Sequence, residues 1–173
     1  QCGVLHLDMK PENFLLDANG TVKVNDFGFS KVYKNVLGVK PEHDVSNGGA
    51  SLYMPPERLQ ERDFGPPADV YSFGILFWQI VTREEPFLQH QIRGELPPFR
   101  KAVCEDGERP PLDHPRIREC HSVPLKELLA RCWSHSASAR PTFPAVISVL
   151  DELLVDAATA DPIGRAFWKK YFL

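Results

Sequence analysis

The sequence contains no apolar run close to the ~20 residues that a membrane-spanning helix needs. Its N-terminus also lacks the charged, then apolar, then small-residue pattern of a secretory signal peptide. Charge of one sign does not dominate either, since 20 Lys and Arg stand against 23 Asp and Glu. This balance supplies no electrostatic reason to expect a nucleic-acid or membrane-surface partner. We therefore expect a cytoplasmic protein with no nucleic-acid partner and no membrane span.

Cysteine pairs are absent as well. None of Cys2, Cys104, Cys120 and Cys132 forms a C-x-x-C pattern, and no histidine lies at a zinc-ligand spacing from a cysteine pair. We therefore expect reduced and mostly buried thiols rather than a disulfide framework or a zinc site. The composition that remains, 43% hydrophobic and 25% charged, is typical of one ordinary globular domain.

Two patterns define the expected local structure. Asn19-Gly20 lies between two β-prone runs, which predicts a hairpin over 14–25. Residues 68–82 are apolar nearly all round, which predicts a buried helix at the centre of the domain. Residues 28–53 show no sustained period and are predicted as loop. Further helices are expected at 55–59, from Pro97-Pro98 to before Gly107, at 123–133, and from Arg140-Pro141-Thr142 to about Val155.

A cluster of polar residues near the N-terminus indicates chemistry. Asp8, Lys10 and Asn13 lie close together, and Asp26 follows at the end of the predicted hairpin. Phosphoryl transfer needs a carboxylate to accept the proton of a hydroxyl, oxygen ligands for Mg²⁺ and a cation near the phosphate. Asp8 can be the base, Lys10 the cation, and Asn13 and Asp26 the metal ligands. Each pattern alone is more typical of a turn, but the set favours this reaction.

These residues also resemble a known family. His6-x-Asp8-x-Lys10-x-x-Asn13 and Asp26-Phe27-Gly28 resemble the catalytic and magnesium-binding loops of eukaryotic protein kinases. Later elements of that family are matched in the same order by Met54-Pro55-Pro56-Glu57, Asp69-Val70-Tyr71-Ser72-Phe73-Gly74, Cys132-Trp133 and Arg140-Pro141. The resemblance implies the C-terminal lobe of the protein kinase fold, mainly α with a small β-hairpin. It implies a partial kinase domain over 1–155 and a C-terminal extension over 156–173.

The resemblance assigns roles to individual residues. It implies transfer of the ATP γ-phosphate to a protein substrate, with ATP and Mg²⁺ as cofactors. Asp8 and Lys10 would be catalytic, Asn13 and Asp26 would bind the metal, and Leu15 would form the floor of the adenine site. Lys10, Asn13 and Asp26 would contact the nucleotide together with Leu15. Structural roles are implied for a buried Glu57–Arg140 ion pair, and for Asp69 as acceptor from the backbone around His6 and Leu7.

Other residues indicate which group of protein kinases the sequence resembles. Lys10 follows the pattern of serine/threonine kinases, whereas Trp78 and Arg131-Cys132-Trp133 are similar to tyrosine kinases and tyrosine-kinase-like kinases. The combination indicates a tyrosine-kinase-like protein kinase with Ser/Thr or dual specificity. Residues 161–173 resemble the segment after the catalytic domain in amoebal kinases that carry an SH2 domain, which implies an SH2 or other regulatory domain outside this chain. The alternative is an amphipathic helix that packs its aromatic side chains on the lobe.

Three departures from the family bear on activity. Leu7 replaces the usual arginine before the catalytic Asp, so we expect a weaker dependence on loop phosphorylation. Ala50 occupies a position where a threonine is common. No G-x-G-x-x-G occurs, and the N-terminal β lobe is absent. The simplest explanation is a fragment that binds Mg-ATP poorly and is inactive alone. The alternative is a non-catalytic scaffold that uses the surface of 84–121 to dock a partner.

Overall fold

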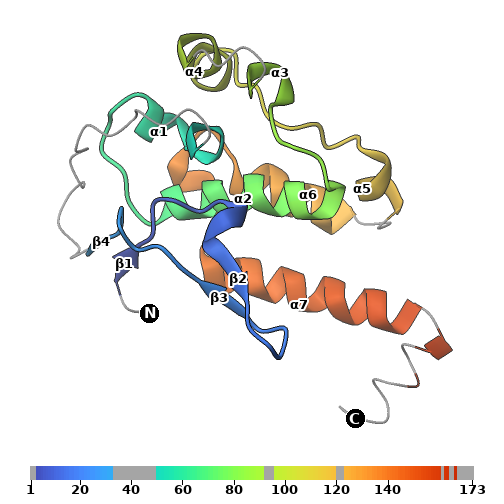
Figure 1. The fold of residues 1–173 in the computed structure, drawn as a ribbon. Coiled ribbons are helices and arrows are strands. Elements are labelled where there is room, and N and C mark those ends of the chain that lie inside the picture. The colour runs from blue at the N-terminus through green and yellow to red at the C-terminus, as the bar shows by residue number, and fades with distance from the viewer. Residues whose placement is uncertain are drawn as a thin grey trace.

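The computed structural model describes residues 3–32, 50–91, 96–119, 123–160, 162–163 and 166. Within these ranges the strands form two antiparallel pairs, β1 (Val4–Leu5) with β4 (Lys31–Val32) and β2 (Phe14–Leu16) with β3 (Val22–Val24). The rest is mainly helical, which confirms the predicted fold class (Figure 1). The α-helices are α1 (Pro56–Leu59), α2 (Pro67–Thr82), α3 (Leu88–Gln91), α4 (Leu96–Cys104), α5 (Pro115–Glu119), α6 (Val123–Cys132) and α7 (Phe143–Ala160), and the 3₁₀ turns are η1 (Pro11–Asn13), η2 (Ala50–Tyr53) and η3 (Ala137–Ala139).

The predicted hairpin is confirmed, and its turn explains why it forms. The Asp17 carboxylate accepts the backbone N–H groups of Asn19 and Thr21, each at 2.9 Å. Gly20 adopts a φ of 76°, which a residue without a Cβ reaches at little cost. The register that results pairs Phe14 with Val24. The hairpin therefore returns the chain to the point where η1 ends.

The pairing of β1 with β4 was not predicted, and placing 28–53 wholly in loop was wrong for Lys31–Val32, which form β4, and for Ala50–Tyr53, which form η2. Val4 lies opposite Val32 and Leu5 lies opposite Lys31. Two-residue strands are too short for an alternating pattern to stand out in the sequence. The short helices α3 and α5 escaped prediction for the same reason. The pairing is decided by how the hairpin brings the chain back, not by local propensity.

Helix α2 runs through the middle of the molecule, as its apolar sequence predicted (Figure 1). Tyr71 and Ile75 are completely buried, and Trp78 is 2% exposed. Burial is not uniform, however, because Ile80 in the last full turn is 60% exposed. Helix α6 packs along α2, and the two helices supply much of the hydrophobic core. The first turn of α2 is therefore a rigid base for whatever it contacts.

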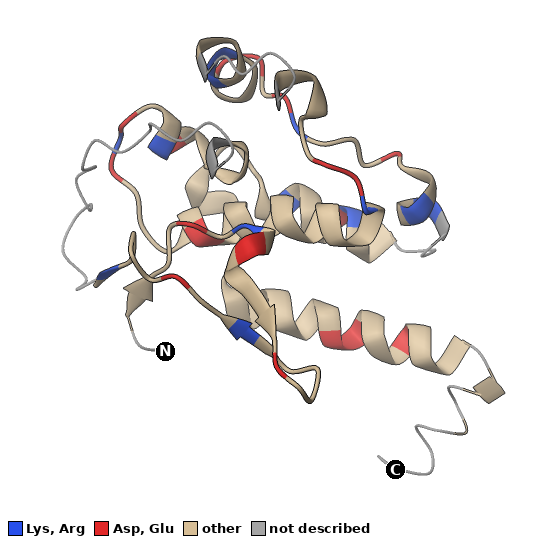
Figure 2. Cartoon of the chain, in the orientation of Figure 1, with Lys and Arg blue, Asp and Glu red and all other residues tan. Residues whose placement is uncertain are grey.

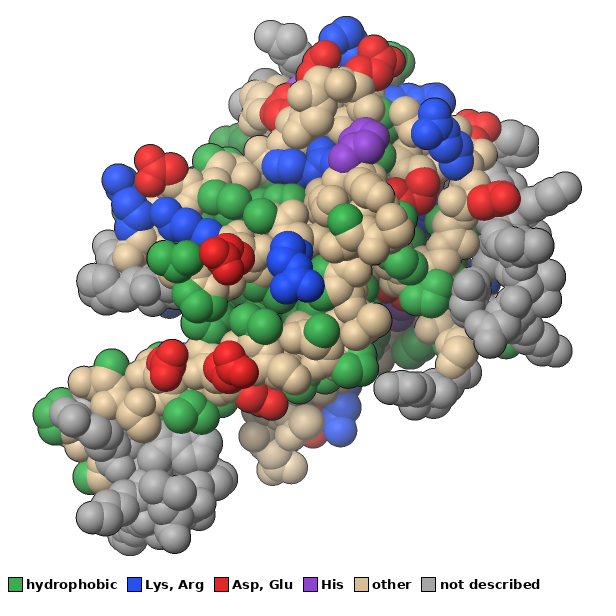
Figure 3. All heavy atoms as spheres, turned by 180° about the vertical axis from the view of Figure 1, so that it is seen from behind, with side chains coloured by type: hydrophobic (Ala, Val, Ile, Leu, Met, Phe, Trp, Pro, Cys, Tyr) green, Lys and Arg blue, Asp and Glu red, His purple; other side chains and the backbone are tan. Residues whose placement is uncertain are grey.

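Helix α7 is longer than predicted. It continues to Ala160 rather than ending at about Val155, because residues 156–160 contain three alanines and no proline or glycine. Its first half packs against α6 through the buried Val146, whereas Leu154 is 59% exposed. The C-terminal end stands out from the body (Figures 1 and 3). The division at residue 155 thus falls inside α7 and stays a prediction, and the tail aromatics Phe167, Trp168, Tyr171 and Phe172 lie outside the described residues.

The described surface carries both charges. Lys and Arg positions are interspersed with Asp and Glu positions along the ribbon over the body of the molecule (Figure 2). The part of the chain that the structure describes contains no helix that is both long and apolar enough to cross a bilayer.

Gly74 on α2 allows α6 to approach closely. A Cβ at this position would lie 2.7 Å from the Cβ of Cys132, inside van der Waals contact. Because a Cβ atom is fixed to its helix backbone and cannot move away by side-chain rotation, the helices would have to separate.

We expect Gly74→Ala to lower the free energy of unfolding by about 1–2 kcal/mol, despite the better helix propensity of alanine. Equilibrium denaturation followed by tryptophan fluorescence measures the change. Ile80→Ala, at an exposed position of the same helix, serves as the control and should shift stability by less than about 0.5 kcal/mol. An unchanged or increased stability of Gly74→Ala would show that the helices can move apart without cost.

Candidate active site

The segment from His6 to Asn13 is anchored to α2 by hydrogen bonds. Asp69, in the first turn of α2 and 6% exposed, accepts the backbone N–H of His6 at 2.7 Å and that of Leu7 at 2.8 Å. A carboxylate is favourable there because the helix dipole is positive at its N-terminus. The predicted role of Asp69 is confirmed. It ties the loop that carries Asp8 to the central helix.

Asp8, Lys10 and Asn13 come together as predicted. The Asp8 Oδ2 atom lies 2.8 Å from Lys10 Nζ and accepts a 2.9 Å hydrogen bond from Asn13 Nδ2. The same Asn13 amide donates to the Asp8 carbonyl oxygen at 2.7 Å. Asp8 is 9% exposed and Asn13 is 4% exposed, so these charged and polar groups satisfy one another inside the protein.

His6 connects this loop to the chain that leaves the hairpin. Its Nδ1 atom accepts the Asp8 backbone N–H at 3.3 Å, so the hydrogen resides on Nε2, which donates to the Asn25 carbonyl at 2.9 Å. The Asn25 N–H in turn donates to the Asn13 carbonyl at 2.8 Å. The two clusters that the sequence placed on either side of the hairpin therefore meet at one edge.

Asp26 follows directly after this junction. Its backbone is left-handed, with a φ of 56°, and its Oδ1 atom accepts the Gly28 N–H at 3.1 Å. The Asp26 side chain is exposed, while the Phe27 ring packs edge-on against His6 with the centroids 5.1 Å apart. A carboxylate is thus presented to the solvent beside the Asp8 loop.

Leu15 lies on β2 and is 48% exposed, so it is not a core residue. Leu16, Val22 and Val24 of the same hairpin are also exposed, at 71%, 57% and 43%. Side chains alternate between the two faces of a strand, so Leu15 shares its face with its cross-strand partner Lys23, while Leu16, Val22 and Val24 lie on the other face. The hairpin therefore exposes apolar side chains on both of its faces next to the polar cluster.

The other side of the Asp8 loop faces a small polar hollow. Arg58, Tyr53 and Ser72 contribute to its lining together with Asp8. Burial raises the pKa of Tyr53, with a further contribution from Glu85, and the phenol donates to Gln79 Oε1 at 2.5 Å. Tyr53 is therefore a neutral hydrogen-bond donor here. Arg58 was not picked out from the sequence, although it is the neighbour of Glu57.

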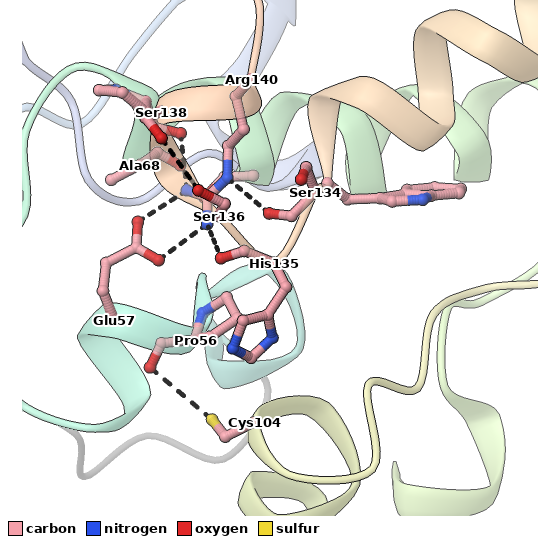
Figure 4. Close-up of polar contacts among 12 residues, drawn as sticks. Pro56, Glu57, Ala68, Cys104, Ser134, His135, Ser136, Ser138 and Arg140 are labelled. Atoms are coloured by element: carbon pink, nitrogen blue, oxygen red, sulfur yellow. Dashed lines mark hydrogen bonds and ion pairs between the residues drawn. The ribbon is translucent and has the colours of Figure 1, made fainter.

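The predicted ion pair between Glu57 and Arg140 is confirmed (Figure 4). The Arg140 guanidinium contacts both carboxylate oxygens of Glu57, at 2.7 and 2.8 Å. Its remaining donors reach the carbonyls of Ser134 at 2.9 Å, Pro67 at 3.0 Å and His135 at 3.5 Å. The Arg140 side chain is completely buried, so this pair joins α1 to the start of α2 and to the segment before α7.

The Tyr71 ring contacts two arginines, of which Arg140 is buried and Arg109 is partly exposed. The guanidinium carbons of Arg109 and Arg140 lie 5.2 and 5.0 Å from the centre of its ring. Burial raises the pKa of Tyr71, and its hydroxyl has no hydrogen-bond partner among the described residues. The ring is therefore a neutral π surface that both guanidinium groups contact.

The buried thiols agree with the expectation where the structure describes them. Cys104 and Cys132 are free and buried, and burial raises the pKa of Cys132 to about 11. Cys2 and Cys120 lie outside the described residues, as do the side chains of Ala50 and Ser51.

Comparison with known proteins identifies the family. The protein kinase domain family matches residues 1–150. Dual specificity protein kinase shkC of Dictyostelium discoideum is 42% identical over 169 residues, which cover 98% of this chain and 31% of that protein. Dual specificity protein kinase shkA of the same organism is 40% identical over 170 residues, covering 97% and 30%. Receptor-interacting serine/threonine-protein kinase 4 of Mus musculus is 39% identical over 156 residues, covering 87% and 19%.

The chain therefore belongs to the protein kinase family, and its resemblance to the tyrosine-kinase-like group is confirmed. It spans about 30% of the length of the two amoebal relatives. An SH2 domain in the parent protein stays a prediction.

The Glu57–Arg140 pair yields a stability prediction. Glu57→Gln leaves the buried Arg140 charge without its counter-ion, so we expect a loss of about 3 kcal/mol in the free energy of unfolding. Urea denaturation provides the measurement. Glu152→Gln, the same change at an exposed position of α7, is the control and should leave the midpoint where it is. Equal midpoints for the two variants would mean that Arg140 finds another partner or water.

Proposed function

We propose that this chain forms the C-terminal lobe of a protein kinase that transfers the ATP γ-phosphate to Ser and Thr hydroxyls of proteins, and to Tyr as well. The names of the amoebal relatives, which are dual specificity kinases, support the specificity. The observation that carries the proposal is the cluster of Asp8, Lys10 and Asn13 on one rigid loop. A scaffold would not need this set together with the exposed Asp26 carboxylate.

Asp8 is the proposed base. Asn13 and Lys10 both contact its Oδ2 atom, which leaves Oδ1 to accept the proton of the substrate hydroxyl. The two donors also hold the carboxylate in one orientation, so little reorganisation is needed when the hydroxyl arrives. Lys10 carries a positive charge beside the base, where negative charge on the transferred phosphoryl group would be stabilised.

The residues present fit a magnesium ion. Because Nδ2 of Asn13 is committed to Asp8, the amide oxygen is the atom of Asn13 left for a ligand, and Asp26 supplies a carboxylate. Magnesium in such enzymes is held by one or two protein oxygens and completed by phosphate oxygens and water. No group of three or more His, Cys, Asp or Glu gathers in the described ranges, in keeping with this open type of site. When bound, Mg²⁺ would neutralise charge on the phosphates.

The exposed hairpin is the proposed floor for the adenine ring. Leu15 is 48% exposed, on the hairpin face that it shares with Lys23. A purine can cover Leu15 on one side only, so a second wall has to close the site. We propose that an N-terminal lobe of the full-length protein supplies this wall, and that the chain alone binds Mg-ATP poorly and is inactive.

The first test removes the base. In the full-length protein, Asp8→Asn should lower the rate of phosphate transfer to a peptide by at least about a thousandfold, because the hydroxyl proton loses its acceptor. Binding of ATP, measured by calorimetry, should stay within about threefold. Asp63→Asn, at an exposed position, is the matched control and should keep full activity. Retained transfer in Asp8→Asn would refute the proposed mechanism.

The second test concerns regulation. Leu7 is 5% exposed and packs with Leu5, Phe64 and Ala68, so an apolar side chain fills the place where the family has a phosphate-binding arginine. We expect phosphatase treatment of the full-length protein to leave at least about half of its activity. Mass spectrometry would verify that the phosphate is gone. A loss of activity of more than tenfold after complete dephosphorylation would show that another cationic side chain binds the phosphate.

A further inference from the structure

Arg58, on α1, reaches the loop that carries Asp8. Its Nη1 atom donates a hydrogen bond to the Leu7 carbonyl oxygen, on the residue immediately before Asp8. The guanidinium also lies over the Phe64 ring, with its carbon 5.5 Å from the ring centre. Nothing in the sequence resemblance gave Arg58 a role. Its contact nonetheless joins α1 to the Asp8 loop.

The backbone at Leu7 needs such a contact. Leu7 has a φ of 67°, a left-handed conformation that is strained for a residue with a branched side chain. Its N–H is held by Asp69 Oδ1 at 2.8 Å, and its carbonyl is held by Arg58. Hydrogen bonds on both sides of one residue determine the plane of the peptide that follows. That peptide leads into Asp8 and therefore sets the direction of its side chain.

The positive charge of Arg58 is favourable beside the carboxylates around it. Burial lowers its pKa, while the carboxylates of Asp69, Asp8 and Glu57 act in the opposite direction. Arginine remains protonated in proteins even when it is buried. Arg58 therefore keeps a positive charge next to two carboxylates of the site, Asp69 and Asp8, that would otherwise repel each other and a phosphate.

We propose that Arg58 is a positioning residue for phosphate transfer: from α1 it fixes the Leu7–Asp8 peptide and so presents Asp8 to the substrate hydroxyl. This inference rests on the proposed function. Both side chains that hydrogen-bond to the Leu7 backbone come from helices, Asp69 from α2 and Arg58 from α1. The loop is consequently held in place without a phosphate on the segment that precedes α1.

The test uses three variants of the full-length protein. Arg58→Met should lower kcat for a peptide substrate about 10- to 100-fold, because small displacements of a catalytic group have effects of this size. The KM for ATP should stay within twofold, since Arg58 does not line the hairpin. Arg58→Lys, which keeps the charge and a donor, should recover most of kcat. Arg62→Met removes an exposed arginine just beyond the same helix and should change nothing.

Hydrogen exchange supplies a readout that does not depend on activity. In Arg58→Met the amides of Leu7 and Asp8 should exchange at least fivefold faster, while those of α6 keep their protection and show that the protein is folded. Unchanged exchange at Leu7 and Asp8, or a kcat equal to that of Arg62→Met, would overturn the role of Arg58. Transfer that persists in Asp8→Asn would instead refute the proposed function, and the exchange result would still decide whether Arg58 holds the loop.

Discussion

The buried guanidinium of Arg140 is the interaction on which the rest of the structure depends. A completely buried arginine has five N–H donors that all need acceptors, and a charge that needs a counter-ion. The fold meets this demand with the Glu57 carboxylate and the carbonyls of Pro67, Ser134 and His135. Since these groups come from α1, the start of α2 and the segment before η3, satisfying one side chain positions three parts of the chain together.

The candidate active site inherits its geometry from this arrangement. Helix α1 carries Glu57, which pairs with Arg140, and next to it Arg58, which reaches the Leu7 carbonyl. Helix α2 begins where Arg140 contacts Pro67, and its first turn carries Asp69, which holds the N–H groups of His6 and Leu7. The loop with Asp8 is therefore fastened to the core by two short connections, so its rigidity comes from packing rather than from its own sequence.

The two sides of the loop that carries Asp8 differ in whether their side chains already have partners within the described structure. Toward the core, the polar groups of His6, Asp8 and Asn13 have partners, and the loop needs nothing further. Toward the hairpin, the Leu15 side chain is about half exposed, and Asp26 presents an exposed carboxylate. The groups proposed for proton transfer are thus already in position, whereas the proposed nucleotide side needs a further surface. This contrast supports the proposal of a second lobe that faces this one across the substrate.

The sequence by itself determined the features that local chemistry controls. Asn19-Gly20 predicted the hairpin turn, the apolar run of α2 predicted a buried helix, and the order of the kinase patterns indicated the family, with Asp8, Lys10, Asn13 and Asp26 as candidates. Only the tertiary structure decided the β1–β4 pairing, the contact of Gly74 with Cys132 and the reach of Arg58 to Leu7. Each of these joins residues far apart in the chain, where no pattern of spacing reveals a neighbour. A residue's type shows what it can bind, but packing decides which partner lies within its reach.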